Sequence, residues 1–519
     1  LVIALAAVVT SLAVIAGSLW WSARPVGTPV AVEWSDAVPS DPLTAATVLA
    51  LGEATHGTAE FHSARLDLLK KVAGKGFTTI AFEDDFGHTA AVDAWLQGGP
   101  GTADEAAAQF GYGIHRTTQM RDLLAWARAW NEERPAEQHI RIVGIDAGGP
   151  ERTKAMALAW LATRNPDAAR SLGERLSRLN DGALFDKEVA QATEAASADL
   201  QAALAASDDG SPAAAQAIQA GRVVEQSRNR AFEGVMARDP LLFDNLTWVV
   251  ERGAAEGRRH TLLFAHNGHV DRSGQANGAP GQKLGRLAAD HFGDAYRTIG
   301  TDGHRVSLGS QGETFSFTVN APYRGLFAGT TVGYLEMAAA RGDNAAVLRG
   351  SHPMASAGAP FAAWQALLPM AHSLNVVPAQ AWDAVIYVWD AHPATPLPCA
   401  AAPQGRSLHP IHPHRVPPRR DRGPEQGFAE HGNTGDPESR AVFRRDGVGE
   451  IAKFVAQNPA APPDRAATLW PGSPVGCCGR HLDGPASGAP EGAETATSAS
   501  CEGRVGHGRW MRSPSWRSS

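Results

Sequence analysis

Six short apolar runs, each followed at once by polar residues, constrain this 519-residue chain more than any other feature. Between several of them lie stretches with helical spacing of apolar residues, such as 60–73 and 119–131. Alternating strands and helices predict an α/β fold, in which a largely parallel sheet is flanked by helices. The predicted strands are 47–52, 78–82, 141–145, 261–265, 296–299 and 384–388.

One internal region departs from this alternation. The stretch from about 151 to 256 is rich in Ala, Leu, Glu and Arg and contains no run that predicts a strand. It is broken at Asn165-Pro166 and again at 208–212, as expected between helices. We therefore predict a mostly helical insertion subdomain within one domain that spans 41–398.

The composition changes after Pro398. The segment 399–519 holds 15 of the 34 prolines and almost no periodic apolar pattern. It is either a low-complexity, disordered tail or the product of a shifted reading frame. All four cysteines lie in this segment, so the predicted domain contains neither a cysteine nucleophile nor a thiolate metal site.

The chain opens with an apolar stretch, 1–21, that contains no charged residue. It is long enough to cross a bilayer as a helix, and it predicts a transmembrane anchor or signal segment joined by a linker, 22–40. The alternative is a buried core helix, which an extreme terminus that is apolar on all faces disfavours. We therefore expect a membrane-anchored or exported protein on the extracytoplasmic side.

The net charge argues against one class of partner. At −7 the chain has no overall basic field, whereas nucleic-acid binding needs clustered Lys and Arg to displace counterions. We expect no nucleic-acid partner. The oligomeric state is left open by the sequence.

Four acidic or histidine residues stand where predicted strands end: Glu53, Glu83, Asp146 and His266. A single acid at such a position is usually a solvated loop residue. In a parallel sheet, however, the carboxyl ends of the strands share one edge, and ligands bind in the crevice there. Four such residues at one edge therefore predict a functional site.

The first motif is Gly52-Glu-Ala-Thr-His-Gly57. Its glycines allow a tight turn after the strand, and Glu53 and His56 are close enough in sequence to face one substrate. A carboxylate beside an imidazole orients it and stabilises its protonated form, which suits a general base. Arg65, on the helix that follows, either balances the carboxylates, holds a polarised oxygen or forms a surface or structural ion pair.

The second motif is Ala265-His-Asn-Gly-His-Val270. Two histidines three residues apart raise the possibility of a metal site, but a strand-to-loop pair lacks the helical i, i+4 spacing of zinc proteases. We favour catalytic or orienting roles for His266 and His269 and no metal, with metal ligation as the alternative.

These motifs together resemble the erythromycin esterase family in order and spacing. The resemblance rests on the two motifs above, on Glu83, and on Arg238-Asp239 with Asn245. It covers roughly 41–390. It implies hydrolysis of a cyclic ester, as in macrolide lactones, without a cofactor and without a serine nucleophile.

The resemblance also implies roles for individual residues. Water is activated by His56 as general base, and Glu53 and Glu83 orient the base and the water. His266 and Arg65 bind or polarise the carbonyl group.

Further residues are implied to lie at or near the substrate. His269 and Arg238 belong there, although Pro240 is unexpected in a helix and could shift the start of that helix. His115 lies where family members are often aromatic-rich, so it is either an added substrate-binding group or a loop histidine. The loop interpretation predicts only a mild effect of His115→Ala.

Two other functions stay open. Related sequences are also named succinoglycan biosynthesis proteins, which suggests an esterase that acts on envelope polysaccharide. A non-catalytic binding module could instead use His266 and His269 to hold a porphyrin-like or metal ligand. The carboxylates beside His56 favour an enzyme, because a pure binder needs no group to orient a base.

Overall fold

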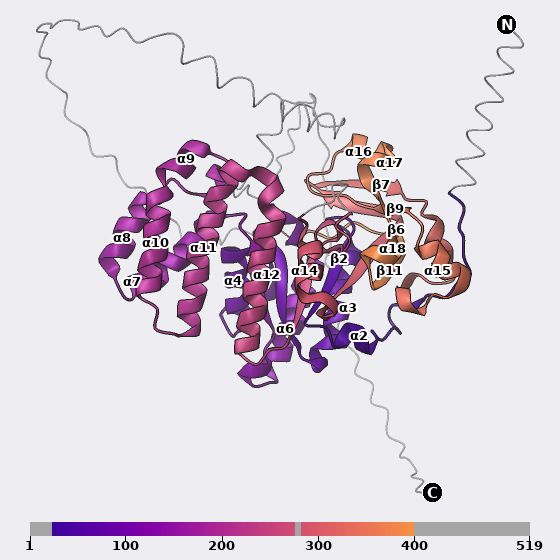
Figure 1. Ribbon diagram of the computed structural model, residues 1–519, viewed down its shortest axis with the longest axis horizontal. Coiled ribbons are helices and arrows are strands. Elements are labelled where there is room, and N and C mark those ends of the chain that lie inside the picture. The colour runs from indigo at the N-terminus through magenta and orange to yellow at the C-terminus, as the bar shows by residue number, and fades with distance from the viewer. Residues whose placement is uncertain (1–22, 276–281, 399–519) are drawn as a thin grey trace, which may run out of the picture. The chain divides into compact units, whose positions relative to one another are not determined.

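A nine-stranded sheet forms the centre of the computed structural model, which describes residues 23–275 and 282–398 (Figure 1). The strand β7 (Glu313–Thr318) pairs only with β6. The other strands lie in the order β1 (Val32–Glu33), β8 (Val332–Glu336), β11 (Ala384–Ala391), β6 (Tyr296–Ser310), β2 (Val48–Glu53), β5 (His260–His266), β3 (Phe77–Asp85) and β4 (Arg141–Asp146).

The sheet is largely parallel. The six strands from β11 to β4 all run in one direction, whereas β7 and β8 are antiparallel to their neighbours β6 and β11. The predicted α/β fold is therefore confirmed, and the six predicted strands correspond to β2, β3, β4, β5, β6 and β11. Because these strands are parallel, their carboxyl ends meet at one edge.

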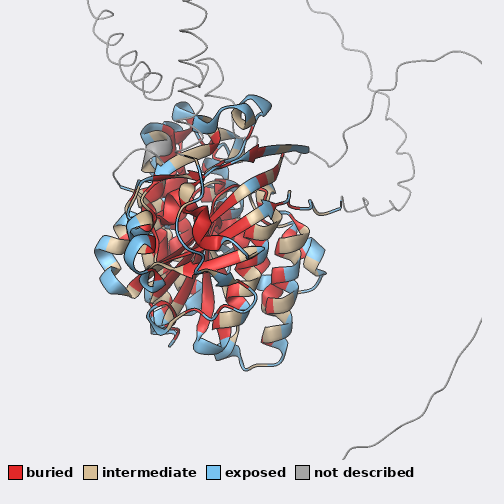
Figure 2. Cartoon of the chain, turned by 90° about the vertical axis from the view of Figure 1, so that its right-hand side faces the viewer, coloured by how far each residue is buried: buried red, intermediate tan, exposed pale blue. Residues whose placement is uncertain are grey.

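Helices cover both faces of the sheet, and β2 shows how its sequence achieves this. Leu49 and Leu51 pack with α3 (Ala59–Val72) and α6 (Thr118–Glu132), whereas Val48 and Ala50 pack with α12 (Arg238–Ala255) and α14 (Leu284–Phe292). Side chains alternate between the two faces of a strand, so a wholly apolar strand is buried on both. Figure 2 shows the strands red inside helices whose outer faces are pale blue.

Between β4 and β5 every regular element in the structure is a helix, as expected for 151–256. These helices bury a core of their own, which includes Leu161, Leu200 and Val224 and joins the sheet through Phe86 and Ala147. The helices preceding α12 are α7 (Pro150–Ala162), α8 (Pro166–Arg175), α9 (Lys187–Ala192), α10 (Glu194–Ala206) and α11 (Pro212–Glu233).

Several elements were not predicted from the sequence. A two-stranded sheet of β9 (His352–Ala355) and β10 (Ser373–Val376) lies between β8 and β11 in the chain. These strands are short and lack a clear alternation of apolar residues.

The remaining helices are α2 (Asp41–Thr44), α4 (Phe86–Leu96), α5 (Ala103–Ala107), α13 (Asn267–Val270), α15 (Gly342–Leu348), α16 (Ala363–Leu367), α17 (Pro369–His372) and α18 (Pro378–Ala381).

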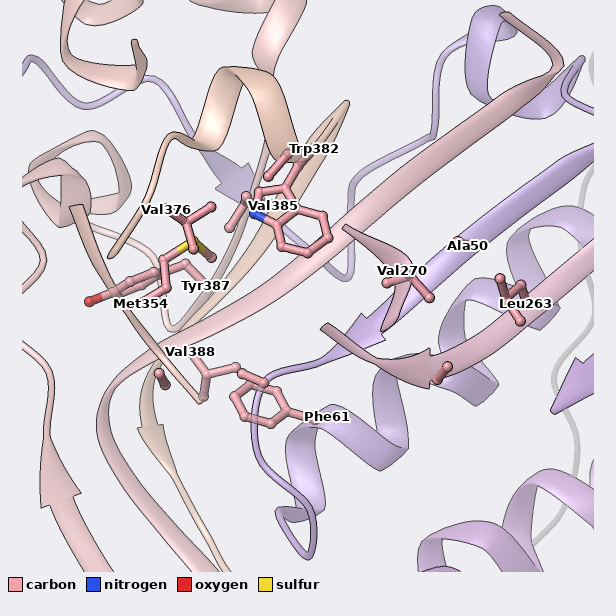
Figure 3. Packing of buried hydrophobic residues seen from close by; sticks show 14 of the residues in the cluster. Ala50, Phe61, Leu263, Val270, Met354, Val376, Trp382, Val385, Tyr387 and Val388 are labelled. Carbon is pink, nitrogen blue, oxygen red and sulfur yellow. The ribbon is translucent and has the colours of Figure 1, made fainter. Parts of the chain in front are cut away.

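This later part of the chain packs directly on the central strands. Trp382 and Val385 lie near Val270, and Phe61 of α3 lies beside Val388 (Figure 3). A side chain at position 300 of β6 would collide with the indole of Trp382, which a built Cβ approaches to 2.6 Å. The close packing fixes β11 and its neighbours against the strand ends of the site.

Two expectations lie outside the described residues: the N-terminal segment 1–21 and the tail 399–519. Within residues 23–275 and 282–398, no helix has both the length and the apolar character needed to cross a membrane.

Candidate active site

Two glycines shape the loop that follows β2. A Cβ on Gly52 would lie 2.1 Å from Asn267 Oδ1, and one on Gly57 would lie 2.1 Å from the carbonyl oxygen of Gly309. Gly57 also has a φ of +77°, which L side chains seldom adopt. Both positions therefore require glycine, and the loop between them is held against β6 and α13.

Backbone hydrogen bonds fix the same loop. Ala54 N–H donates to Thr301 Oγ1 at 2.8 Å, and His56 N–H donates to the carbonyl of Ala357 at 3.0 Å. Ala357 N–H in turn donates to the carbonyl of Ala54 at 3.0 Å. The side chain of His56 thus projects from a backbone that is tied to two other segments.

One carboxylate organises the first group of site residues, which we call the β2 cluster: Glu53, His56, His62 and Arg65. Glu53 Oε2 lies 3.2 Å from His56 Nδ1 and 2.5 Å from Arg65 Nη2, and Oε1 lies 2.9 Å from His62 Nε2. Glu53, His62 and Arg65 are buried, whereas the side chain of His56 is 12% exposed. His56 is therefore the member that a substrate can reach.

Charge in the β2 cluster is unevenly distributed. Burial opposes ionisation of Glu53, but Arg65, His62 and His56 attract the carboxylate and hold its pKa well below the usual range. Burial lowers the pKa of His62 to about 4, so this histidine is neutral at pH 7. Among the described residues, no partner is recorded for His56 Nε2. That nitrogen is free to accept a proton.

A second group, the β3 cluster, consists of Glu83, Asp146, Arg238, Asp239 and His269. Arg238 donates to Glu83 Oε1 at 2.8 Å and to Asp146 Oδ2 at 2.7 Å. His269 lies 2.7 Å from Asp239 Oδ1 through Nδ1 and 3.3 Å from Glu83 Oε1 through Nε2. The first turn of α12 supplies both Arg238 and Asp239, so Pro240 does not delay this helix.

The β3 cluster holds its histidine in the charged form. Burial lowers the pKa of His269, but the negative charges of Glu83 and Asp239 outweigh it and raise the pKa to about 9. Both ring nitrogens of protonated His269 are donors, so Arg238 Nη1, 3.1 Å from Nε2, is a neighbouring cation rather than a hydrogen-bond partner. The pKa of Glu83 lies well below its usual range because His269 and Arg238 overcome the effect of burial. Two cations therefore stand together at the strand ends.

His266 lies between the two clusters. Its ring centroid is 4.9 Å from that of His56 and 6.4 Å from that of His269. Its Nδ1 accepts from Gly268 N–H at 3.1 Å and its Nε2 donates to the carbonyl of Ala54 at 3.0 Å. Burial lowers its pKa to about 3, so the ring is neutral at pH 7. Neither ring nitrogen is available to polarise a carbonyl group in this arrangement.

The structure therefore brings the predicted residues to one edge but gives some of them other contacts than expected. Arg65 is 2% exposed and binds Glu53, so it does not face a substrate carbonyl. Glu83 makes no hydrogen bond to His56 and instead accepts from Arg238 and from the backbone N–H of His266 at 2.6 Å. Their roles toward a substrate stay predictions, and the contacts place these two residues behind His56 and Arg238.

His115 lies in a 3-10 turn, residues 113–115, but it is only 1% exposed. Its Nδ1 lies 2.8 Å from Asp84 Oδ2, and its Nε2 has no partner. Burial lowers the pKa of His115. This loop histidine is thus a packed residue that supports Asp84, which also accepts from the backbone of Gly111 and Tyr112.

Sequence reasoning missed several residues of the site. His62 lies on the same helix face as Arg65, three positions away, and that spacing is the signal that could have found it. Tyr112 donates to Asp146 Oδ2 at 2.6 Å, and Arg230 of the helical insertion lies 3.5 Å from Asp146 Oδ1. No local pattern marks Tyr112 or Arg230, because each meets Asp146 only through the tertiary fold.

The His, Asp and Glu side chains of the site are of types that can bind metal ions. No group of three or more His, Cys, Asp or Glu side chains in the described ranges is arranged to hold a metal ion. The two histidines of the second motif show why: the backbone occupies both nitrogens of His266, and carboxylates occupy both nitrogens of His269.

A pocket lies away from these residues, beside β4 and between α4 and α12. The first residues of β3 and β4, including Thr79 and Arg141, line it together with Trp248 of α12. No residue of the β2 or β3 cluster lines it. We therefore locate the chemistry at the carboxyl ends of the strands, where the ionisable groups converge.

A sequence model of the erythromycin esterases matches residues 72–391, well over half of the chain. This chain belongs to the erythromycin esterase family. The matched range includes all members of the β3 cluster. The residues of the β2 cluster, which carry the family-like Gly52–Gly57 motif, come just before it.

Solved structures show the same fold as this erythromycin esterase family member. A Bacillus cereus protein is 19% identical with a TM-score of 0.60, and covers 73% of this chain and 97% of its own. A succinoglycan biosynthesis protein is 16% identical with a TM-score of 0.59, covering 72% and 95%. A variant of the erythromycin esterase EreC in its open conformation is 16% identical with a TM-score of 0.50, covering 69% and 94%.

Proposed function

We propose that this protein hydrolyses carboxylic esters, including cyclic esters, of small molecules, and that His56 activates the attacking water. Membership of the erythromycin esterase family supports ester hydrolysis. The observation that carries the mechanism is the Glu53–His56 pair, in which one ring nitrogen is bound to a buried carboxylate and the other is free.

The first step is attack on the ester carbonyl. A water molecule at His56 Nε2 forms a bond to the carbonyl carbon while its proton passes to Nε2. The positive charge that develops on the imidazole is stabilised by Glu53, which stays ionised because Arg65 and His62 hold its pKa low. Glu53 thus acts on the base and not on the substrate.

The negative charge of the tetrahedral intermediate needs a positive partner. Arg238 and protonated His269 supply two cations at the same edge, and their side chains are 17% and 11% exposed. Both are fixed by Glu83 and by a second carboxylate before a substrate arrives. Donors that are oriented in advance stabilise a developing oxyanion without reorganisation.

Collapse of the intermediate completes the reaction. The carbon–oxygen bond to the alcohol breaks, and the proton held by His56 passes to the leaving oxygen. The products are a carboxylic acid and an alcohol, which remain one molecule when the substrate is a lactone. His56 returns to its neutral form, so the cycle requires only water and the ester.

Substitution of His56 tests this proposal. We expect His56→Ala to lower kcat by roughly two to four orders of magnitude, the usual contribution of a general base, and to leave KM within a few-fold. The assay uses a panel of macrolactones and simple sugar and alkyl esters, with His291→Ala, an exposed histidine of α14, as the matched control. Unchanged hydrolysis by His56→Ala would remove His56 from the mechanism, and no hydrolysis of any ester by the wild type would remove the proposed function.

A further inference from the structure

One segment of the described chain is unusual in having no charge over a long distance. From Gly350 to Trp382, between Arg349 and Asp383, 33 consecutive residues include no Asp, Glu, Lys or Arg. The segment contains β9, α16, α17, β10 and α18. Four of its side chains form what we call the apolar tip: Trp364, Leu367, Leu368 and Met370.

The apolar tip is exposed. Leu367 and Met370 are each 80% exposed, and Trp364 and Leu368 are 42% and 45% exposed. Nine large apolar side chains of the described residues are exposed, and four of them fall within these seven positions. Single exposed apolar residues are ordinary, but a contiguous group marks a surface that contacts another apolar phase.

The inner side of α16 and α17 explains why the tip stays outside. Phe361 packs against Phe315 and Phe317 of β7 with ring centroids 5.5 and 5.8 Å apart, and His372 stacks on Phe317 at 4.2 Å. The underside of this helical pair is therefore already occupied, so the outer side chains have no position in the core to move into. The tip therefore lies on the outer side of the packed segment.

The apolar tip is also connected to the candidate active site. Ser356 N–H donates to the carbonyl of His372 at 2.9 Å, and the next residue, Ala357, accepts the backbone N–H of His56 at 3.0 Å. The segment that carries the tip thus forms a wall of the loop that holds His56.

We propose that the apolar tip inserts into the interfacial region of a lipid bilayer. Trp and Leu side chains are favoured at that depth, and an interface without charges suits a zwitterionic surface. Stable membrane binding usually takes two signals. The sequence offers the second in residues 1–21, which are uncharged and long enough to span a bilayer.

The described chain begins at a point that is fixed on the domain. Arg324 donates to the carbonyl of Ala23 at 2.8 Å, and Val26 N–H donates to that of Pro322 at 2.8 Å, so residues 23–26 are fixed on the domain. They lie in the same right-hand part of the view as α16 and α17 (Figure 1). A second protein is a poorer occupant, since a stable interface needs about 20–30 residues a side with a polar rim.

The test places a polarity-sensitive fluorophore on the tip of the full chain. The four native cysteines are replaced by serine, Leu367→Cys is labelled with nitrobenzoxadiazole, and phosphatidylcholine vesicles with or without doxyl-labelled lipid are added. We expect a blue shift and quenching by the doxyl lipid at position 367. Val38→Cys, which replaces another exposed apolar residue (76% exposed) outside the tip, is the matched control and should respond weakly.

A second variant separates the tip from the N-terminal segment. Met370→Glu in the labelled protein should reduce the quenching at position 367 about tenfold or more, since burying a charge in the interface is costly. An aqueous spectrum at position 367 with vesicles would overturn the proposal. So would a blue shift that depends on protein concentration alone, which indicates a second copy, or on added ester alone, which indicates a substrate wall. None of these readings requires catalysis, so they are independent of the proposed esterase activity.

Discussion

The β2 and β3 clusters both combine carboxylate, histidine and arginine side chains, but their buried histidines His62 and His269 have opposite charge states at pH 7. In the β2 cluster one carboxylate, Glu53, serves two histidines and an arginine, and burial keeps His62 neutral with a pKa of about 4. In the β3 cluster two carboxylates flank a single histidine, and the pKa of His269 rises to about 9. At His269 two carboxylates outweigh burial, whereas at His62 burial outweighs the single carboxylate Glu53.

This difference separates two chemical tasks. A general base needs a nitrogen that can take up a proton, which suits His56, because Glu53 binds Nδ1 and leaves Nε2 free. Stabilisation of an oxyanion needs a group that is already positive at neutral pH, which suits His269 and Arg238. The ring of His266, which is bound to the backbone through both nitrogens, lies between the rings of His56 and His269.

Removal of the shared carboxylate should have the largest effect. Glu53→Ala leaves Arg65 buried without its anion, and breaking a buried ion pair in this way costs about 3–5 kcal/mol. We expect a fall in the free energy of unfolding of that order and loss of ester hydrolysis. Urea denaturation measures the first quantity.

The control for Glu53→Ala is Glu60→Ala, which removes an exposed ion pair with His392. Glu60 lies at the start of α3, the helix that carries Arg65. That variant should change the free energy of unfolding by under about 1 kcal/mol. Equal stability of the two variants would contradict the central position given to Glu53.

Loss of a cation from the β3 cluster should affect turnover more than binding. We expect Arg238→Met to lower kcat by about two to three orders of magnitude, as removal of an oxyanion donor does elsewhere, with a smaller change in KM. Arg141→Met is matched, because Arg141 also pairs with a carboxylate, Asp93, but at the opposite edge of the sheet. If both variants kept wild-type kcat, oxyanion stabilisation would have to come from another group.

Much of this arrangement was predictable, and the reason is topological. Strands that are apolar on both faces fix which residues stand at their carboxyl ends, so Glu53, Glu83, Asp146 and His266 could be assigned to one edge. Their partners could not be assigned. For Arg65 the sequence left open whether it balances the carboxylates or holds a substrate oxygen, and only the structure shows it buried on Glu53.

The charge states could not be predicted either. His62 and His269 differ by about five in pKa, and nothing in their local sequences distinguishes them. Burial and the number of nearby carboxylates cause the difference, and both depend on which helices cover the strand ends. Tyr112 and Arg230 reach Asp146 from other parts of the chain for the same reason.

The two clusters should lose stability on opposite sides of neutral pH. His269 has a folded pKa of about 9, above the ordinary 6.5, so its contribution is complete below pH 6.5 and is lost as the pH rises through 9. His62 has a folded pKa of about 4, so stability falls as the pH drops from 6.5 to 4. Each window is worth on the order of 3 kcal/mol at most, at 1.4 kcal/mol per pKa unit.

Two substitutions distinguish the loss of stability at alkaline pH (the alkaline limb of the curve of stability against pH) from the loss at acid pH (the acid limb). The free energy of unfolding is measured against pH from 4 to 9.5, and its slope is compared rather than its absolute value. His269→Asn should flatten the alkaline limb alone, and His62→Asn should flatten the acid limb alone. Loss of the same limb in both variants would show that the charge assignment of one cluster is wrong.

The smallest expected effect on hydrolysis is that of His115→Ala. His115 pairs with Asp84, which neighbours Glu83 and accepts the backbone N–H of Tyr112 at 3.2 Å; its ring centroid lies 6.2 Å from that of His62. His115→Ala removes a buried hydrogen bond and should lower the free energy of unfolding by about 1–3 kcal/mol. Because His115 does not face a substrate, kcat should fall less than tenfold, in line with the mild effect expected from the sequence.

The matched control for His115→Ala is His139→Ala. His139→Ala removes a half-buried histidine that bonds Gln97 and the carbonyl of Arg134, far from the strand ends. Both variants should lose stability, but only His115→Ala should change the pH dependence of kcat, because only His115 binds Asp84, the residue next to Glu83 in β3. Identical pH profiles for His115→Ala and the wild type would mean that Asp84 keeps its position, and its effect on Glu83, without His115.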